Sequence, residues 1–284
     1  MILITGASGN VGKEVLKQVA QTGAKVRAAY QEVKKAPSLP GVDVVAMDYN
    51  QPDSMRAALQ GVDRVFLVGP PTAQLPDLER KAIDAIKQAH VKQAVKLSAM
   101  GGRDAIFPRQ HAESEDYIQH SGVSYTFLRP NGFMQNLVNY SAGTINSQNA
   151  FYGSEGDGKI SHIDIRDVAA VAVKTLTEDG HLNKSYTLTG PEALTNSEIA
   201  QLLSETIGRE VRFINLPPEQ FKQAVLSAGV PEWNANALVD LQRLYREGKA
   251  AAVTQDVEKV TGRKPTTFRE FLQDHRSDFQ VQKA

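Results

Sequence analysis

Three glycines near the amino terminus have the spacing of a loop that binds a diphosphate. They follow the apolar run Ile2–Ile4 and precede a segment in which apolar residues recur at helical spacing. In such a strand–turn–helix unit, glycine allows a tight turn, a close approach of the backbone to the diphosphate, and close packing of helix on strand. The free N–H groups and partial positive charge at the helix start then face the anion, which favours a dinucleotide site over an ordinary strand-to-helix turn. The predicted contacts are Gly6, Ser8, Gly9, Asn10, Val11 and Gly12.

A histidine and a glutamate four residues apart are the next candidates for chemistry. His111 and Glu115 share one face of the predicted helix Asp104–His120. A histidine with a pKa of about 6.5 can carry a proton at neutral pH, so His111 could act as an acid. The same spacing fits a solvated histidine with a charge partner, and the residues alone do not choose between these roles.

Strand and helix patterns alternate along the first half of the chain, which predicts right-handed crossovers and a doubly wound parallel sheet of the Rossmann type. The predicted strands are Ile2–Ile4, Lys25–Tyr30, Val42–Met47, Asp63–Val68, Gln93–Ser98 and Ser124–Arg129. The predicted helices after the glycine loop are Pro52–Leu59, Leu75–His90 and Asp104–His120. Ligands of such sheets bind beyond the carboxyl ends of the strands, so we expect the site there.

After about Gly132 the pattern changes to longer helices with short strands. The elements expected here are the strands Lys159–Ile165, Ser185–Leu188 and Val211–Asn215, the helices Arg166–Thr177, Pro217–Ala228 and Trp233–Glu247, and capping boxes at Thr195–Glu198 and Thr267–Glu270. We therefore expect a dinucleotide-binding domain of residues 1–132 plus about 159–178. Residues 133–158 and 179–284 would form a smaller α/β lobe that covers the substrate.

Composition excludes several classes of protein and of chemistry. The chain has no cysteine, which rules out disulfides and thiolate nucleophiles, and its six histidines lack metal-ligand spacing. The 32 basic and 32 acidic residues are mixed, so we expect no nucleic-acid or membrane partner. The first strand begins at Met1 or Ile2, leaving no room for a signal peptide, and we expect a cytoplasmic protein. The sequence leaves the oligomeric state open.

Motifs along nearly the whole chain resemble one family. Thr5–Gly12 is similar to the Thr-Gly-x-x-Gly-x-x-Gly loop of extended short-chain dehydrogenases, and His162–Ala169 resembles their segment ending in Asp-Val-Ala. Arg129–Asn136 resembles the Arg-Pro-x-x-Phe-Met-x-Asn stretch of the NmrA-like branch, which includes bacterial NAD(P)H quinone and azo-dye reductases. Tyr186–Glu192 and Val260–Phe268 fit the carboxyl-terminal lobe of the same branch.

One departure from the general short-chain dehydrogenase pattern concerns the proton donor. That pattern has a Tyr-x-x-x-Lys pair on the helix after the fifth strand, but here Tyr117 is followed by Ser121. His111 with Glu115 is the nearest substitute. The resemblance to NmrA-like reductases implies direct hydride transfer without a tyrosine acid, which suits quinones and azo compounds better than simple ketones.

The residues after the second strand bear on the choice between NAD and NADP. Many relatives have Arg-Asn-Pro-x-Lys here, whereas this chain has Gln31 in place of the arginine and Glu32 at the spacing typical of NAD binding. Lys35 keeps the later basic position, and Lys34 stands beside it. These two lysines favour NADP, although they also fit an exposed loop.

The resemblance implies further contacts at the ends of the later strands. Asp48 matches the position that bonds the adenine amino group, Tyr49 would flank the ring, and Gly69 and Pro70 follow the fourth strand. Ser98 matches a Ser or Thr near the nicotinamide, or it caps the next loop. The predicted pocket for a small aromatic substrate is lined by Met100, Phe133, Asn136 and Tyr140.

Three functions are consistent with these motifs. The preferred one is an NAD(P)H-dependent reductase of quinones or azo compounds. The second is a sensor like NmrA, which binds the dinucleotide and regulates a protein partner without turnover. The third is a biosynthetic reductase of a specific aromatic or polyketide substrate. Isoflavone-reductase-like relatives use a lysine on the helix after the fifth strand, and no lysine lies between Lys96 and Lys159.

Overall fold

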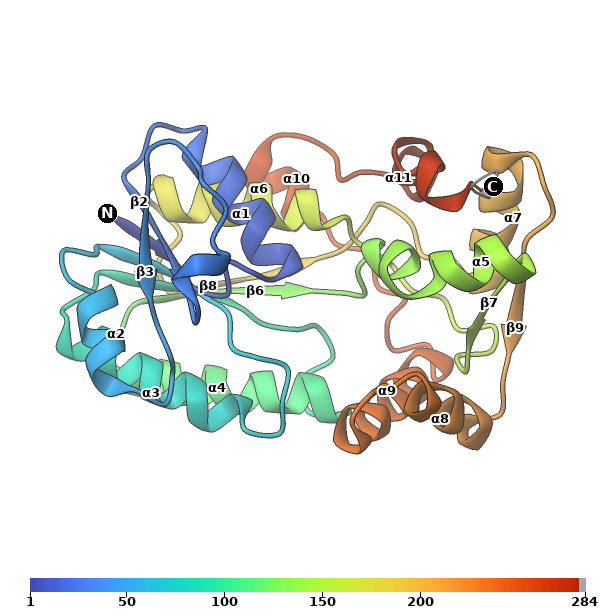
Figure 1. Cartoon of the computed structure of the whole chain (residues 1–284), viewed down its shortest axis with the longest axis horizontal. Coiled ribbons are helices and arrows are strands. Elements are labelled where there is room, and N and C mark those ends of the chain that lie inside the picture. The colour runs from blue at the N-terminus through green and yellow to red at the C-terminus, as the bar shows by residue number, and fades with distance from the viewer. Residues whose placement is uncertain (281–284) are drawn as a thin grey trace.

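Within residues 1–280, which the computed structural model describes, seven parallel strands form the main sheet (Figure 1). Their order is β3 (Val42–Ala46), β2 (Val26–Tyr30), β1 (Ile2–Ile4), β4 (Arg64–Leu67), β5 (Gln93–Leu97), β6 (Tyr125–Pro130) and β8 (Lys184–Leu188). Every neighbouring pair is parallel, so the carboxyl ends of all these strands meet at one edge. The order is the Rossmann order with β8 added, and the predicted fold class is confirmed.

Helices cover both faces of this sheet, as Figure 1 shows. The helices of one face are α1 (Asn10–Ala20), α6 (Ile165–Thr177) and α10 (Asp256–Thr261), and those of the other are α2 (Pro52–Ala58), α3 (Leu75–Gln88) and α4 (Ile106–Ser121). The residues of the central strand β1 are all apolar because both faces of this strand are buried. Ile2 and Ile4 pack in the core with Leu16 of α1, whereas Leu3 points to the opposite face and packs in the core that contains Ile83 of α3.

The smaller lobe has its own sheet and core. Its strands β7 (Ala150–Gly153) and β9 (Arg212–Asn215) are parallel, and its helices are α5 (Ala142–Gln148), α7 (Asn196–Ile207), α8 (Pro218–Ser227), α9 (Glu232–Arg246) and α11 (Phe268–Asp274). Phe151, Leu203 and Phe271 belong to one buried cluster between these elements. Both predicted capping boxes form, at Thr195 and at Thr267.

The structure corrects the expected strand Lys159–Ile165. Three isoleucines in this segment are typical of a strand, but only isolated bridges form, at Ile160 and Ile163. The backbone N–H groups of this segment donate to three separate places: Ile160 to Leu194, Ser161 to Ala250, and Ile163 to Gly132. The segment therefore connects the two parts of the molecule instead of pairing with one neighbouring strand.

The division between the two parts also differs from the expected one. β8 was assigned to the smaller lobe with residues 179–284, but it pairs with β6 and extends the main sheet. α10 likewise packs on α6 of the larger part. No helix within residues 1–280 has the length and apolarity needed to cross a bilayer.

Candidate active site

The loop between β1 and α1 has a geometry that only glycine permits. Gly6 has a φ of +60°, and a Cβ built on it would lie 2.9 Å from the Cβ of Val68, at the end of β4. A Cβ on Gly12 would lie 2.1 Å from the carbonyl oxygen of Gly6. The N–H of Gly9 donates to that same oxygen at 2.9 Å, which closes the turn. The loop thus packs against β4 at the point where the strand order reverses, the usual place for a ligand in such sheets.

The beginning of α1 is open to an anion. Gly9 has an extended backbone and no side chain to cap the helix, and the first turn contains no acidic residue. Asn10 is exposed, while Val11 and Gly12 are buried. The first N–H groups of an α-helix have no acceptor within the helix, so those of Asn10 and Val11 remain available. The loop therefore fits the diphosphate of a dinucleotide, because Gly9 has no side chain and no acidic residue of the first turn would repel the anion.

The residues after β2 are exposed and largely paired with one another. Gln31 is exposed, and Lys34 and Lys35 end the short 3₁₀-helix Val33–Lys35. The Glu32 carboxylate forms an ion pair with each lysine, at 2.5 Å from Lys35 Nζ and at 3.4 Å from Lys34 Nζ. In this arrangement Glu32 partly offsets the two positive charges that favour a 2′-phosphate.

The next two strand ends are tied together by hydrogen bonds. The Tyr49 hydroxyl donates to the Val68 carbonyl at 2.7 Å, and burial raises the pKa of Tyr49. Asp48 Oδ1 accepts the N–H of Asn50 at 2.8 Å and so belongs to the turn that it begins. Beyond β4, the Pro70 carbonyl accepts the N–H of Thr72 at 2.8 Å. The expected cofactor crevice lies beyond the carboxyl ends of the strands. The loops after β3 and β4 thus form one wall of this crevice.

The buried residues Ser98 and Glu115 form one cluster with the half-buried Arg129. Ser98 Oγ donates to Glu115 Oε1 at 2.5 Å, and Arg129 donates to both carboxylate oxygens, through Nε at 2.9 Å and 3.2 Å and through Nη2 at 2.5 Å. This pairing with Glu115 raises the pKa of Arg129. The cluster joins the ends of β5 and β6 to α4, so Glu115 is held in place beside Ser98.

A buried lysine that sequence reasoning did not single out explains the position of His111. Lys96 Nζ donates to Glu79 Oε2 at 2.6 Å and lies 3.1 Å from His111 Nδ1, while Glu79 Oε1 accepts the N–H of Gly69 at 3.2 Å. Lys96 and Glu79 are fully buried. The sequence did contain one signal of this role: Lys96 is an ionisable residue inside the buried strand β5 (Gln93–Leu97).

These contacts change the expected role of His111. The predicted pairing of His111 with Glu115 is not found in the part of the chain that the structure describes, because Glu115 bonds Ser98 and Arg129 instead. Burial lowers the pKa of His111 well below its usual value, and the positive charge of Lys96 lowers it further. At pH 7 His111 is therefore neutral and has no imidazolium proton to donate. This argues against the predicted role of His111 as an acid.

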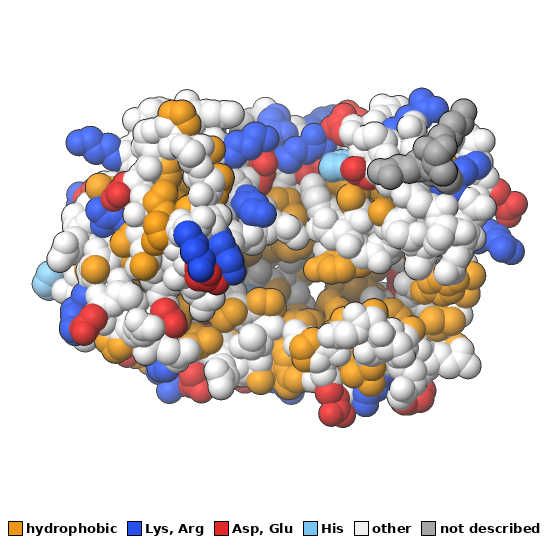
Figure 2. Space-filling model, in the orientation of Figure 1, with side chains coloured by type: hydrophobic (Ala, Val, Ile, Leu, Met, Phe, Trp, Pro, Cys, Tyr) orange, Lys and Arg blue, Asp and Glu red, His pale blue; other side chains and the backbone are white. Residues whose placement is uncertain are grey.

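The predicted pocket residues occupy different environments. Phe133 is half-buried and bridges to Ile163, and the N–H of Met100 donates to Pro130 at 2.9 Å. Asn136 is exposed, and Tyr140 is 78% exposed, so neither lines an enclosed space. Figure 2 shows a hollow between the larger part and the smaller lobe, with hydrophobic side chains around it.

His162 and Tyr245 are two further titratable residues at the carboxyl edge of the sheet. Both lie beside Gly132: a Cβ built there would be 3.2 Å from His162 Cδ2 and 3.3 Å from Tyr245 Oη. The sequence motifs include His162 in the segment His162–Ala169 but predict no site role for His162 or for Tyr245. The two residues are more than 80 positions apart in the sequence, and no local pattern signals that both lie beside Gly132.

The depressed pKa of His162 predicts a loss of stability in mild acid. Burial lowers the pKa of His162 to about 4, so between pH 6.5 and 4 the unfolded chain binds more protons at this residue than the folded protein. Stability is therefore lost as the pH falls through this range, by about 2 kcal/mol at pH 4.5. Urea unfolding at pH 7 and pH 4.5 measures this loss of stability. The loss should be smaller by about 2 kcal/mol in His162→Phe, because that variant lacks the titrating group. An equal loss in both proteins would contradict the assignment.

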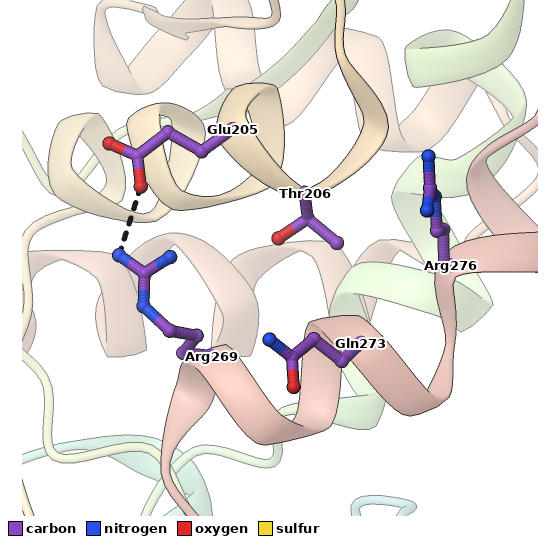
Figure 3. A pocket seen from close by; sticks show the side chains of 5 residues that line it. All are labelled: Glu205, Thr206, Arg269, Gln273 and Arg276. Atoms are coloured by element: carbon purple, nitrogen blue, oxygen red, sulfur yellow. Dashed lines mark hydrogen bonds and ion pairs between the residues drawn. The ribbon is translucent and has the colours of Figure 1, made fainter.

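A shallow pocket in the smaller lobe is separate from this site. It lies between α7 and α11, has a volume of about 400 Å³, and is lined by Glu205, Thr206, Arg269, Gln273 and Arg276 (Figure 3). Arg269 Nη2 is already paired with Glu205 at 2.9 Å, and Figure 3 shows Arg276 apart from that pair. Among residues 1–280 there is no group of three side chains arranged to hold a metal ion.

Three reductases resemble the chain over nearly its whole length. It is 39% identical to the NAD(P)H azoreductase of Xenophilus azovorans, with 98% of this chain and 99% of the relative covered. The crystal structure of an NADPH-dependent quinone oxidoreductase from Escherichia coli with NADPH superposes with a TM-score of 0.89 at 30% identity, covering 96% and 99% of the two chains. Triphenylmethane reductase of Citrobacter sp. with NADP(H) gives a TM-score of 0.88 at 28% identity and the same coverage.

The strand order and the glycine loop define a Rossmann-type α/β protein. The model of the NmrA-like family matches residues 1–272, and the chain belongs to that family. The resemblance seen in the sequence motifs is thereby confirmed.

Proposed function

We propose that this protein, an NAD(P)H-dependent oxidoreductase, passes hydride to a flat, electron-poor aromatic acceptor such as a quinone or an azo compound. The observation that carries this proposal is the position of Tyr117. Its hydroxyl donates to Asp84 at 2.6 Å, away from the Ser98 cluster, and this bond raises the pKa of Tyr117. With Ser121 one turn later, α4 offers no phenol–lysine pair to protonate a simple ketone.

The similar proteins support this choice of acceptor by their chemistry. An azo compound, a quinone and a triphenylmethane dye are the substrates that their names give. All three acceptors are conjugated and spread incoming negative charge over several atoms. Their reduced forms can therefore take a proton from water instead of from a strong acid in the protein.

The residues of this chain would bind and orient the reactants. A bound NAD(P)H supplies the hydride from its nicotinamide ring. The N–H groups at the start of α1 bind its diphosphate, and the loops after β3 and β4 enclose the adenosine side. The Ser98–Glu115–Arg129 cluster fixes the ends of β5 and β6, where the nicotinamide would lie. Holding donor and acceptor about 3–3.5 Å apart supplies most of the rate increase in such a site.

Steady-state oxidation of NADPH with a panel of acceptors tests the proposal. We expect turnover with a naphthoquinone and with a small azo dye, and none with simple aldehydes and ketones. Tight dinucleotide binding without turnover of any acceptor would contradict the proposal and favour the sensor. Turnover confined to one carbonyl compound outside these classes would favour the biosynthetic reductase.

We also propose that the protein prefers NADP to NAD. Lys34 and Lys35 lie where the 2′-phosphate of NADP is bound in such folds, and Glu32 holds them in ion pairs. Replacing Glu32 with glutamine should release both lysines and raise the ratio of NADPH to NADH affinity about threefold to tenfold. Lys35→Gln should lower the same ratio. Isothermal titration with both cofactors measures this ratio of affinities. An unchanged ratio in both variants would contradict binding of the 2′-phosphate beside Lys34 and Lys35.

A further inference from the structure

An imidazole and a phenol from different parts of the molecule converge on one point beside Gly132. A Cβ built on Gly132, just after β6, would lie 3.5 Å from His162 Nε2 and 3.3 Å from Tyr245 Oη. A Cβ on Gly190, just after β8, would lie 2.0 Å from the carbonyl oxygen of His162. His162 is thus held between the ends of β6 and β8, at the edge of the sheet where the substrate of such a fold binds. Tyr245 reaches the same place from α9.

Buried hydrogen bonds fix this arrangement. Asn131 Nδ2 donates to Ser161 Oγ and to the Ala250 carbonyl, both at 2.8 Å, and Asn131 Oδ1 accepts the N–H of Gly132 at 2.9 Å. Ser161 Oγ in turn donates to the Ala252 carbonyl at 2.7 Å. The loop after β6, the segment before His162 and the chain after α9 therefore form one rigid unit. These bonds hold in place the backbone around Gly132 and the backbone just before His162.

Both side chains are neutral at pH 7. Burial lowers the pKa of His162 to about 4, and burial together with Glu155 raises the pKa of Tyr245 above its usual value. Within residues 1–280, His162 Nδ1 is buried without a hydrogen-bond partner. A neutral imidazole whose proton is on Nε2, the nitrogen nearer Gly132, is a hydrogen-bond donor toward that point. The site therefore offers one N–H and one O–H donor and no net charge.

We propose that His162 Nε2–H and Tyr245 Oη–H both donate to one carbonyl oxygen of the acceptor and stabilise the negative charge that this oxygen gains during reduction. The proposal rests on the proposed function and narrows it, because two donors on one atom match the two lone pairs of a carbonyl oxygen. It therefore names a conjugated carbonyl compound of the quinone type as the preferred acceptor. His162 and Tyr245 would be catalytic residues in the sense of an oxyanion site.

The reaction balances without a protein acid. The hydride brings an electron pair from the reduced nicotinamide to the conjugated acceptor, and the nicotinamide becomes oxidised. The charge moves to the acceptor oxygen, which water then protonates. The phenol and the imidazole keep their protons throughout, as their pKa values in the folded protein favour at neutral pH.

Three variants separate this role from a structural one. Tyr245→Phe removes one donor, His162→Phe removes the other, and Gly132→Ala places a methyl group within 3.5 Å of both donor atoms. The matched control is Tyr186→Phe, which removes a phenol hydroxyl 2.8 Å from His181, a histidine that precedes β8 at the opposite end of that strand. Thermal unfolding of each variant shows whether it folds.

The first readout is binding, not activity. Trp233, the one tryptophan of the chain, lies on α9 against Phe107, and its fluorescence reports a quinone that quenches it. With the protein loaded with oxidised NADP, we expect the naphthoquinone Kd to rise about threefold to tenfold in Tyr245→Phe and in His162→Phe. The Kd of NADP itself should stay within twofold of wild type. The Tyr186→Phe control should change neither constant.

The second readout is kcat for NADPH oxidation by the quinone. Each of the two donor variants should lower kcat about 100-fold, because an oxyanion donor acts most strongly in the transition state. If wild type oxidises NADPH with the quinone and folded Tyr245→Phe retains both kcat and quinone affinity, this inference is wrong while the proposed function stands. If Tyr245→Phe does not fold, Gly132→Ala provides the test. Wild-type kcat and wild-type quinone affinity in folded Gly132→Ala would likewise show that this inference is wrong. If wild type reduces no acceptor, the proposed function itself fails.

Discussion

Replacing Gly9 with aspartate abolishes dinucleotide binding while the protein stays folded. The backbone of Gly9 is extended (φ −81°, ψ 167°), and a Cβ there would have only the Gly6 carbonyl nearby, at 3.3 Å. An aspartate at this position would accept hydrogen bonds from the free N–H groups of α1 and take the place of the diphosphate. Because Asp is a slightly better N-cap than Gly, stability should rise by about 0.3 kcal/mol. The dissociation constant for NADPH should rise more than 100-fold through loss of these contacts and charge repulsion.

Gly9→Ala is the matched control for this prediction. It adds the same Cβ without the carboxylate, so it should weaken NADPH binding far less than Gly9→Asp. Isothermal titration gives the affinities, and urea unfolding gives the stabilities. Wild-type affinity in Gly9→Asp would show that the diphosphate does not lie at the start of α1.

Replacing Lys96 with methionine should destabilise the protein by about 3–5 kcal/mol, the usual effect of removing one partner of a buried ion pair. Lys96 and Glu79 are fully buried, 2.6 Å apart. Without the ammonium group, the Glu79 carboxylate has no charge partner within the core. Urea unfolding measures the loss.

The double variant Lys96→Met with Glu79→Gln should recover at least half of that stability, because it removes the second charge as well. The exposed ion pair of Lys92 and Asp63 provides a control, since Lys92→Met should change stability by less than about 1 kcal/mol. A loss of that small size in Lys96→Met would contradict the role of the buried pair. A double variant no more stable than Lys96→Met alone would show that packing, not charge, explains the loss.

The buried pair also connects the core to the candidate cofactor site. Glu79 Oε1 accepts the N–H of Gly69, and a Cβ built on Gly69 would lie 2.9 Å from the Glu79 side chain. Gly69 follows β4, one residue after Val68, the residue against which the glycine loop packs. Lys96 therefore positions a backbone segment that a dinucleotide would contact, without touching the dinucleotide itself.

The elements of the main sheet could be predicted because their signals are local. Ile2–Ile4 is apolar throughout because both faces of the strand are buried, and Gly6 and Gly12 mark the turn that follows. The segment 159–165 is also rich in isoleucine, yet its N–H groups find partners in three different places. Local pattern cannot tell a strand from such a connection, since the two differ only in where their partners lie.

The side-chain partners in the site could not be predicted in the same way. The sequence placed His111 near Glu115 because four residues separate them on a helix. The actual partner of His111 is Lys96 on β5, and Glu115 turns to Ser98 and Arg129. These contacts depend on how α4 packs against the sheet, which the helical spacing does not contain. The placement of His162 and Tyr245 beside Gly132 depends in addition on how the two parts of the molecule meet.

A crystal structure of the protein soaked with NADP tests most directly whether the glycine loop is the cofactor site. We predict the diphosphate against the N–H groups of Asn10 and Val11, with the nicotinamide extending toward Ser98 and Gly132. A dinucleotide bound elsewhere, or a crevice left empty at a concentration that saturates turnover, would contradict the central claim.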